Sequence, residues 1–142
     1  QRVNPFGLLQ NGVKMELNKI HEDHRGSIHA ITGDPLVHPE VSFLHTKTGL
    51  ARGGCIHRKN YEHLVVLEGM IEYYYRLPEE TEIKCAVLIT GQSITIPPNT
   101  PHYMISFSDS VIAEWGCEVE EKQEKHEEFR KIVLDHNLKN GK

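Results

Sequence analysis

Residues 51–69 read ARGGCIHRKNYEHLVVLEG and place a thiol, two imidazoles and a carboxylate just before a plainly apolar run. In a strand, residues i and i+2 point to the same face, so Cys55 and His57 share one side. Glu62 begins the following run, and on an antiparallel return strand its carboxylate can meet the other two side chains. The stretch therefore predicts a pair of strands whose shared face carries groups that bind a metal or move a proton near neutral pH.

A second stretch, residues 91–106, reads GQSITIPPNTPHYMIS. A short alternating run enters a Pro-rich turn, and His102 begins the run that follows. Asn99 lies in this turn, where asparagine tolerates the left-handed backbone that such turns often require. We expect two strands here, with His102 presented at the start of the second one.

Short apolar or alternating runs, rich in Val, Ile, Tyr and Thr and separated by Gly, Pro, Asn and Asp, dominate the remaining chain. This pattern is typical of an all-β sandwich or barrel. We predict strands over residues 13–20, 27–32, 41–46, 54–57, 62–68, 70–77, 83–90, 93–96, 102–107 and 110–117. The segment EKHEEFRKIVLDHNL, residues 124–138, spaces its apolar residues by three and four and predicts one amphipathic C-terminal helix.

A chain of 142 residues has the size of one domain. We divide it into an N-terminal arm (1–12), a β-barrel (13–120) and a helix with its tail (121–142). The acidic run EVEEKQEKHEE, residues 118–128, is expected to be a solvated linker into the helix.

The composition favours a protein that acts on a small molecule. Sixteen Lys and Arg against 20 Asp and Glu give a net charge of −4, without a basic stripe for nucleic acid. No apolar run approaches the roughly 20 residues that span a bilayer, and we expect no secretory signal. The three cysteines form no CxxC pair, so we expect reduced thiols and a cytoplasmic protein, with Cys85 and Cys117 as small buried side chains.

Together the two stretches resemble the two cupin motifs, G(x)5HxH(x)3-4E(x)6G and G(x)5PxG(x)2H(x)3N. The chain has C-x-H-x4-E-x6-G, followed by G-x5-P-x-N-x2-H. Cys55 stands where the first motif has its first His, Asn99 where the second has its turn Gly, and Ser106 where it has its final Asn. The resemblance implies a small antiparallel β-barrel, or jelly roll, whose interior holds the motif side chains.

Residues 19–116 also resemble the cupins that act on nucleotide-linked deoxysugars, the dTDP-4-keto-6-deoxyhexose 3,5-epimerases and 3,4-ketoisomerases. In those proteins an Arg-Gly pair precedes the catalytic histidines, and Arg52 with Gly53 corresponds to this pair. The resemblance implies proton transfer next to a ketone, with His57 as the base and Cys55 at the position of the epimerase base. The residues expected to contact a nucleotide-sugar substrate are Arg52, His102, Tyr75 and Arg76.

The same residues support an alternative, a mononuclear metal site. Cys55, His57, Glu62 and His102 would supply one sulfur, two nitrogen and one oxygen ligand, a set suited to Zn, Fe, Ni or Cu. The protein would then resemble metal cupins of the dioxygenase or sugar-phosphate isomerase type. A noncatalytic sugar-binding cupin is a third alternative. In each case no organic cofactor is expected, and His63, which alternates away from Glu62, is expected outside the site.

A homodimer is the expected assembly. A small barrel with an open sheet edge and apolar strand faces exposes surface that association can cover, and twofold pairing is the commonest solution. The related sugar cupins are usually dimers as well.

Overall fold

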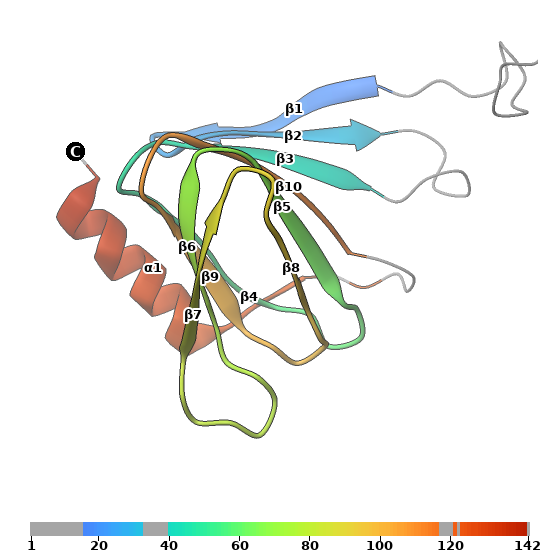
Figure 1. Ribbon diagram of the computed structural model, residues 1–142, viewed down its shortest axis with the longest axis vertical. Coiled ribbons are helices and arrows are strands. Elements are labelled where there is room, and N and C mark those ends of the chain that lie inside the picture. The colour runs from blue at the N-terminus through green and yellow to red at the C-terminus, as the bar shows by residue number, and fades with distance from the viewer. Residues whose placement is uncertain (1–15, 33–39, 117–120, 122, 142) are drawn as a thin grey trace, which may run out of the picture.

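The structure, a computed structural model, describes residues 16–32, 40–116, 121 and 123–141. Its strands form two antiparallel sheets that face each other, with one helix outside them (Figure 1). One sheet has the strand order β1-β2-β3-β10-β5-β8, and the other has the order β11-β4-β9-β6-β7. The predicted antiparallel all-β jelly roll with a short C-terminal helix is confirmed.

The elements have the following bounds: β1 (Glu16–Asp23), β2 (Gly26–Thr32), β3 (Val41–Thr46), β4 (Ala51–Ile56), β5 (Glu62–Glu68), β6 (Met70–Tyr75), β7 (Lys84–Ile89), β8 (Ser93–Ile96), β9 (His102–Ser106), β10 (Ser110–Gly116), β11 (Glu124–Lys125) and α1 (Glu127–Asn140).

The observed strands differ from the predicted ones mainly at their ends. β4 begins at Ala51, three residues earlier than predicted, because Ala51 pairs with Ile105 of β9. β1 continues to Asp23, where it pairs with Gly26 across the β1–β2 turn. The predicted arm, residues 1–12, lies outside the described residues.

The two sheets enclose an apolar core. Side chains alternate along each strand, so every second residue faces inward; on β5 these are Glu62, Leu64 and Val66. The buried core residues are Leu44, Leu64, Val66, Ile71, Tyr73, Leu88, Ile96, Met104 and Ile112. Because the inward face of β5 begins with Glu62, a carboxylate lies at one end of this core.

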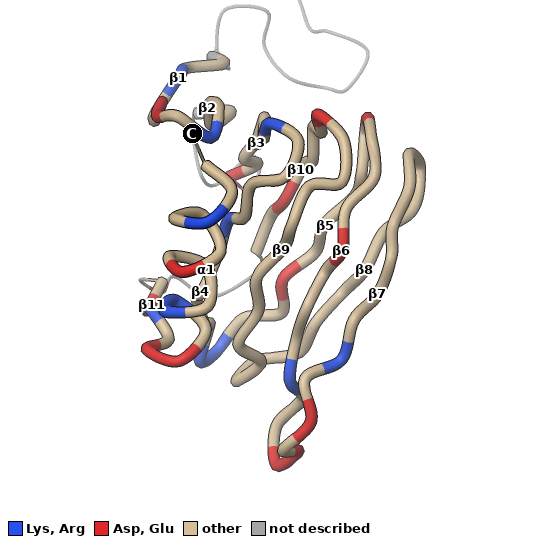
Figure 2. The backbone as a smooth tube through the Cα atoms, turned by 90° about the vertical axis from the view of Figure 1, so that its left-hand side faces the viewer, with Lys and Arg blue, Asp and Glu red and all other residues tan. Residues whose placement is uncertain are grey.

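Helix α1 covers the outer face of β4 and β9, and Figure 2 shows it on the same side as β11. Its buried residues Phe129 and Val133 pack against Ala51 and Tyr103. The helix comes so close to β4 that a Cβ on Gly54 would lie 2.5 Å from a helix Cα atom. Among the described residues, no helix has both the length and the apolar character needed to cross a membrane.

Candidate metal site inside the barrel

The two sequence stretches meet at the same end of the barrel. His57 directly follows β4, Glu62 begins β5, and His102 begins β9. Asn99 has a φ of +61°, so the turn before β9 adopts the left-handed conformation expected there. Its backbone N–H donates to the carbonyl oxygen of His57 at 2.7 Å. This hydrogen bond ties the two stretches together and fixes the backbone at His57.

Three side chains converge at this end. Glu62 Oε2 lies 2.8 Å from His102 Nε2 and 3.3 Å from His57 Nε2. All three candidate ligand atoms lie within 4.8 Å of one another. Glu62 and His102 are only 6% and 3% exposed, whereas His57 is half-buried. The group is therefore enclosed by the barrel on the Glu62 side and approached past His57.

The orientation of His102 is fixed by its other ring nitrogen. His102 Nδ1 lies 3.0 Å from the carbonyl oxygen of Thr100, which can only accept, so Nδ1 carries the proton of this hydrogen bond. The ring also stacks on Tyr73, with centroids 5.9 Å apart. This arrangement directs Nε2 toward Glu62, and a backbone partner on the remote nitrogen is typical of metal-binding histidines.

Charges dominate the electrostatics of the group. Burial lowers the pKa of His102, but the neighbouring Glu62 carboxylate outweighs it and raises the pKa to about 9. Burial likewise raises the pKa of Glu62, but the two imidazoles hold it well below its usual range. The metal-free site therefore pairs an ionised Glu62 with a protonated His102 at neutral pH.

Glu62 Oε2 is buried and faces both imidazoles, at 2.8 Å from His102 Nε2 and 3.3 Å from His57 Nε2. In the metal-free protein the proton on His102 compensates the charge of this carboxylate. A divalent cation bound by Oε2 and the two Nε2 atoms would take over that compensation. Two histidines and one carboxylate form a donor set used for Zn and non-haem Fe. The residues present thus fit a divalent transition metal.

Glu114 adds a second carboxyl group that the sequence analysis missed. It lies on β10 beside Leu64 of β5, and its carboxyl group hydrogen-bonds with Glu62. Burial, followed by the charge of Glu62, raises the pKa of Glu114 to about 8. A signal was available, because Glu114 falls two residues after the core residue Ile112 and therefore faces inward.

Cys55 is the predicted ligand that the structure does not bring into the group. It pairs with His102 in the β4–β9 register and is half-buried, but its sulfur is not among the atoms that converge. Burial and then the charge of Glu62 raise the pKa of the thiol to about 11. Cys55 is therefore a protonated thiol at neutral pH, which does not suit it to act as a base.

Arg52, predicted to contact a nucleotide-sugar substrate, is buried between the sheets and only 3% exposed. Its Nε donates to Thr46 Oγ1 at 2.8 Å, and its Nη2 donates to the carbonyl oxygen of His45 at 3.0 Å. These bonds tie β4 to β3 across the core. The structure thus gives the Arg52 guanidinium a structural role.

Tyr75 and Arg76 are adjacent in sequence but lie on opposite sides of the sheet. Tyr75 pairs with His102 in register and packs on the interior core, near the converging group. Arg76 lies over the ring of Phe129, 5.1 Å from its centroid, and pairs with Glu128 at 3.0 Å. Arg76 therefore contacts the helix and is not near the metal-binding group.

Two further expectations can be compared with the structure. His63 turns away from Glu62, as expected, and its Nδ1 lies 2.8 Å from Thr95 Oγ1 on β8. Cys85 was expected to be buried, but it is exposed, because it lies on the outward face of β7. Cys117 lies outside the described residues.

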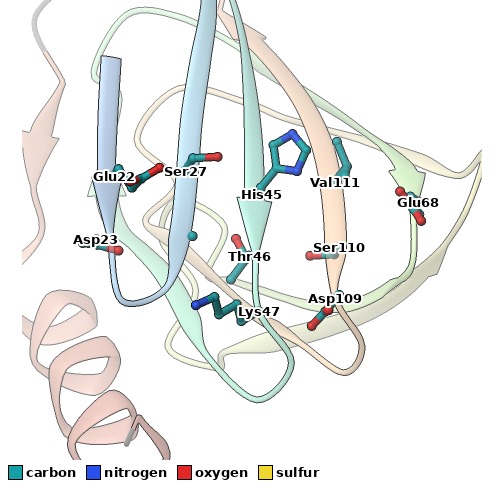
Figure 3. A pocket seen from close by; sticks show the side chains of 11 residues that line it. Glu22, Asp23, Ser27, His45, Thr46, Lys47, Glu68, Asp109, Ser110 and Val111 are labelled. Atoms are coloured by element: carbon teal, nitrogen blue, oxygen red, sulfur yellow. The ribbon is translucent and has the colours of Figure 1, made fainter. Parts of the chain in front are cut away.

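A separate pocket of about 510 Å³ opens where the β1–β2 turn meets the ends of β3, β5 and β10 (Figure 3). Its lining residues are Glu22, Asp23, Gly26, Ser27, His45, Thr46, Lys47, Glu68, Asp109, Ser110 and Val111. They carry charges of both signs and include none of the three converging side chains. The pocket and the candidate metal site are therefore distinct.

No protein-family profile and no curated protein matches the sequence. Solved structures do match the fold. CapF from Staphylococcus aureus, a capsular polysaccharide assembling protein, matches at 21% identity with a TM-score of 0.66 over 79% of this chain and 33% of its own. The chain thus spans about a third of the length of CapF.

Two further structural neighbours match over most of their own length. The cupin domain of CENP-C from Drosophila melanogaster has 17% identity and a TM-score of 0.60, over 72% of this chain and 76% of its own. KdgF from Halomonas sp. has 15% identity and a TM-score of 0.57, over 70% and 84%. Sequence identities this low support a shared fold and no shared function. The two facing sheets, the paired motifs and these neighbours together show that the chain has the jelly-roll fold of the cupins.

Proposed function

We propose that this protein is a metal-dependent cupin enzyme that moves a proton next to a carbonyl group of a small, sugar-type substrate. The convergence of His57 Nε2, His102 Nε2 and the buried Glu62 Oε2 carries the proposal. His57, Glu62 and His102 would hold one divalent transition metal. When bound, such a metal supplies a Lewis acid that polarises a carbonyl oxygen.

The remaining roles fall to residues around this group. The bond from His102 Nδ1–H to the Thr100 carbonyl holds the ring in place. Glu114 is a carboxyl group that hydrogen-bonds with Glu62 and is not one of the three converging ligands, so it remains available to accept or donate a proton. We assign Glu114 the transfer of the proton, because the Cys55 thiol is held protonated and His57 would be occupied as a ligand.

Two observations support a sugar-type substrate. Arg52, Gly53 and His57 follow the order found in the cupins that act on keto-deoxysugars, and the fold is shared with CapF, a capsular polysaccharide assembling protein. A nucleotide-linked keto-sugar is therefore our first choice of substrate. Tyr75, on the inner face beside His102, is placed to contact it.

Elemental analysis of protein purified without a His tag tests the metal. We expect about one equivalent of a first-row transition metal, directly or after incubation with Zn, Fe, Mn, Ni or Cu. Glu62→Gln should lower this occupancy, and Glu68→Gln, a change at the exposed end of the same strand, should not. Less than a tenth of an equivalent under every condition would overturn the proposal.

Deuterium exchange tests the chemistry. In D₂O, metal-loaded protein should incorporate deuterium next to the ketone of a dTDP- or UDP-linked keto-sugar, as followed by NMR, and the chelated protein should not. Equal exchange by both preparations would contradict the metal-dependent reaction. Metal binding without exchange of any keto-sugar would favour the noncatalytic sugar-binding alternative.

A further inference from the structure

Three successive backbone N–H groups in the β4–β5 loop point at one carboxylate. Arg58 N donates to Glu121 Oε2 at 2.9 Å, and Asn60 N donates to Glu121 Oε1 at 2.9 Å. Lys59 N lies 3.1 Å from both oxygens. We call residues 58–60 the amide cradle.

Such an arrangement is a recognised anion-binding geometry. Successive N–H groups in a turn form a concavity of partial positive charge, and it binds phosphate or carboxylate oxygens. The exposed side chains of Arg58 and Lys59 add two full positive charges beside it. The Glu121 side chain is only 7% exposed, so the carboxylate is seated in the cradle and does not merely lie on the surface.

The amide cradle adjoins the candidate metal site. Glu121 Oε1 lies 3.9 Å from His57 Nδ1, and His57 Nε2 faces Glu62. An anion in the cradle would thus lie on the exposed side of His57, where a substrate would enter. Arg52, which the sequence predicted to contact the substrate, is buried with its guanidinium bonded to β3.

We propose that the amide cradle is the subsite for an oxyanion of the substrate, a phosphate or a carboxylate, and that Glu121 fills it when no substrate is bound. The substrate anion and the Glu121 carboxylate exchange places on the same three N–H groups. The proposal rests on the proposed function only in placing this anion beside the metal.

The test is an NMR titration of ¹⁵N-labelled, metal-free protein with inorganic phosphate and, separately, with acetate. Because a tethered group competes at an effective concentration in about the millimolar range or above, Glu121→Ala should bind the anion about tenfold or more tightly than the wild type. The largest shifts should fall on the amides of Arg58, Lys59 and Asn60. Tighter binding of phosphate would assign a phosphorylated substrate, and tighter binding of acetate a carboxylic acid.

Glu124→Ala is the matched control. Glu124 carries the same charge, lies three residues away and bonds the Arg58 side chain, but it accepts none of the three amide bonds. Equal gains in anion binding in both variants would show that only charge repulsion was relieved, and would overturn the subsite. Absence of shifts at the cradle amides in Glu121→Ala would overturn it as well.

A second variant guards against loss of the loop structure. Glu121→Gln keeps a side-chain oxygen that accepts the amide bonds while removing the charge, so it should bind phosphate more tightly than the wild type with unchanged signals elsewhere. No gain in this variant would count against the subsite. Because the titration uses metal-free protein, its outcome is independent of the elemental analysis.

Discussion

His57 directly follows β4, and His63 lies six residues later on β5, in the other sheet. His57 Nε2 lies 3.3 Å from Glu62 Oε2 inside the barrel, whereas His63 bonds Thr95 on the outside. Loss of the hydrogen-bond partner of a metal ligand weakens metal binding by about 10- to 100-fold. His57→Asn removes the ligand itself, so we expect it to weaken metal binding by more than this. His63→Asn should leave it unchanged. Both are measured by competition with a chromophoric chelator.

The opposite result would be informative about the register. Damage by His63→Asn together with a silent His57→Asn would mean that β5 is displaced by one residue against β8 and β10, since such a shift exchanges the two faces of β5. The assignments of both histidines would then fail together.

The raised pKa of His102 predicts how metal affinity depends on pH. The ring is protonated below about 9 in the metal-free protein, and a metal must displace the proton from Nε2. Apparent affinity should therefore rise with pH by about tenfold per unit between roughly pH 7 and 9 and then level off. Affinity that is flat over this range, measured by competition titration, would contradict the His102–Glu62 pair.

The same shift affects the stability of the metal-free fold with the opposite sign. Because the pKa of His102 is raised on folding, its contribution is fully present below the unfolded value of about 6.5. It is lost as the pH rises through about 9. Urea denaturation of chelated protein should therefore show falling stability across this window, to which the raised pKa of Glu114 adds up to about pH 8. His102→Asn should remove the part of the fall that lies between about pH 8 and 9.

Glu114→Gln separates proton transfer from metal binding. The variant keeps the size and polarity of the side chain, and Glu114 is not one of the three converging ligands. We expect metal occupancy to remain near that of the wild type, while deuterium exchange falls by about 10²- to 10⁴-fold, the usual contribution of a positioned acid or base. If the variant instead binds less metal, and each metal-loaded molecule exchanges deuterium as fast as in the wild type, then Glu114 is a structural residue.

The residues that sequence reasoning placed well are those set by strand alternation. Alternation on β5 puts Glu62 inside and His63 outside, as expected. The predicted antiparallel pairing of this strand with the Cys55–His57 strand is wrong, because β4 and β5 belong to different sheets, and Glu62 meets His57 only because the two sheets face each other. Arg52 depends instead on a partner strand, because only the crossing of the two sheets places Thr46 within its reach. The Cys55 sulfur likewise lies outside the converging group because the β4–β9 register shifts between Gly53 and Cys55. No sequence pattern indicates such a shift.

At the scale of elements, the acidic run before the helix was predicted as a solvated linker, and its described residues 123–125, 127 and 128 are exposed. The contacts it makes were not predicted: Glu121 binds the β4–β5 loop, and Glu124 and Lys125 form β11 against β4. Helix α1 then begins at Glu127, because the His126 side chain accepts the N–H of Phe129 as an N-cap. Charge predicts exposure, but it does not predict contacts that require the folded β4 edge.

The approach of α1 to β4 gives a stability prediction. Gly54 has a φ of +85°, and an added Cβ would lie 2.5 Å from Arg130 Cα. Gly91 has a similar φ of +87° but no atom within 4 Å of such a Cβ. Gly91→Ala should therefore cost only the left-handed strain, about 1–2 kcal/mol. Gly54→Ala should cost about 1–3 kcal/mol more, because the helix must move.

Urea denaturation of both variants measures this difference. Equal losses in the free energy of unfolding would mean that α1 does not pack on β4 at Gly54. A larger loss for Gly54→Ala, with the helix signal in circular dichroism reduced before the sheet signal, is the expected outcome.

At the scale of the whole molecule, the fold was accessible from the sequence, but the function has to be argued from the site. Alternating runs and two spaced motifs indicated a jelly roll, because these patterns reflect burial along each strand. The same fold occurs in CapF and in the CENP-C cupin domain, proteins described in very different terms. Fold alone therefore selects no activity, and the Glu62 group has to carry the proposal.

We propose that the predicted homodimer forms through β1. The β1 side chains from Leu17 to Glu22 are all exposed, and Leu17 and Ile20 are 62% and 55% exposed. Figure 1 shows β1 at the outer edge of its sheet, and among the described residues no strand pairs with that edge, a position that favours association. β7 is also an edge strand with exposed Val87 and Ile89, but its other face packs into the core.

We therefore expect sedimentation to give twice the chain mass of 16.3 kDa at micromolar concentration. The double change Leu17→Glu with Ile20→Glu should yield monomers, because it places charge where the second copy packs. The matched double change Val87→Glu with Ile89→Glu should leave the dimer intact. A monomeric wild type would contradict the predicted dimer. Dissociation by the β7 change alone would mean that the dimer forms through the other sheet, because β7 and β1 are edge strands of different sheets.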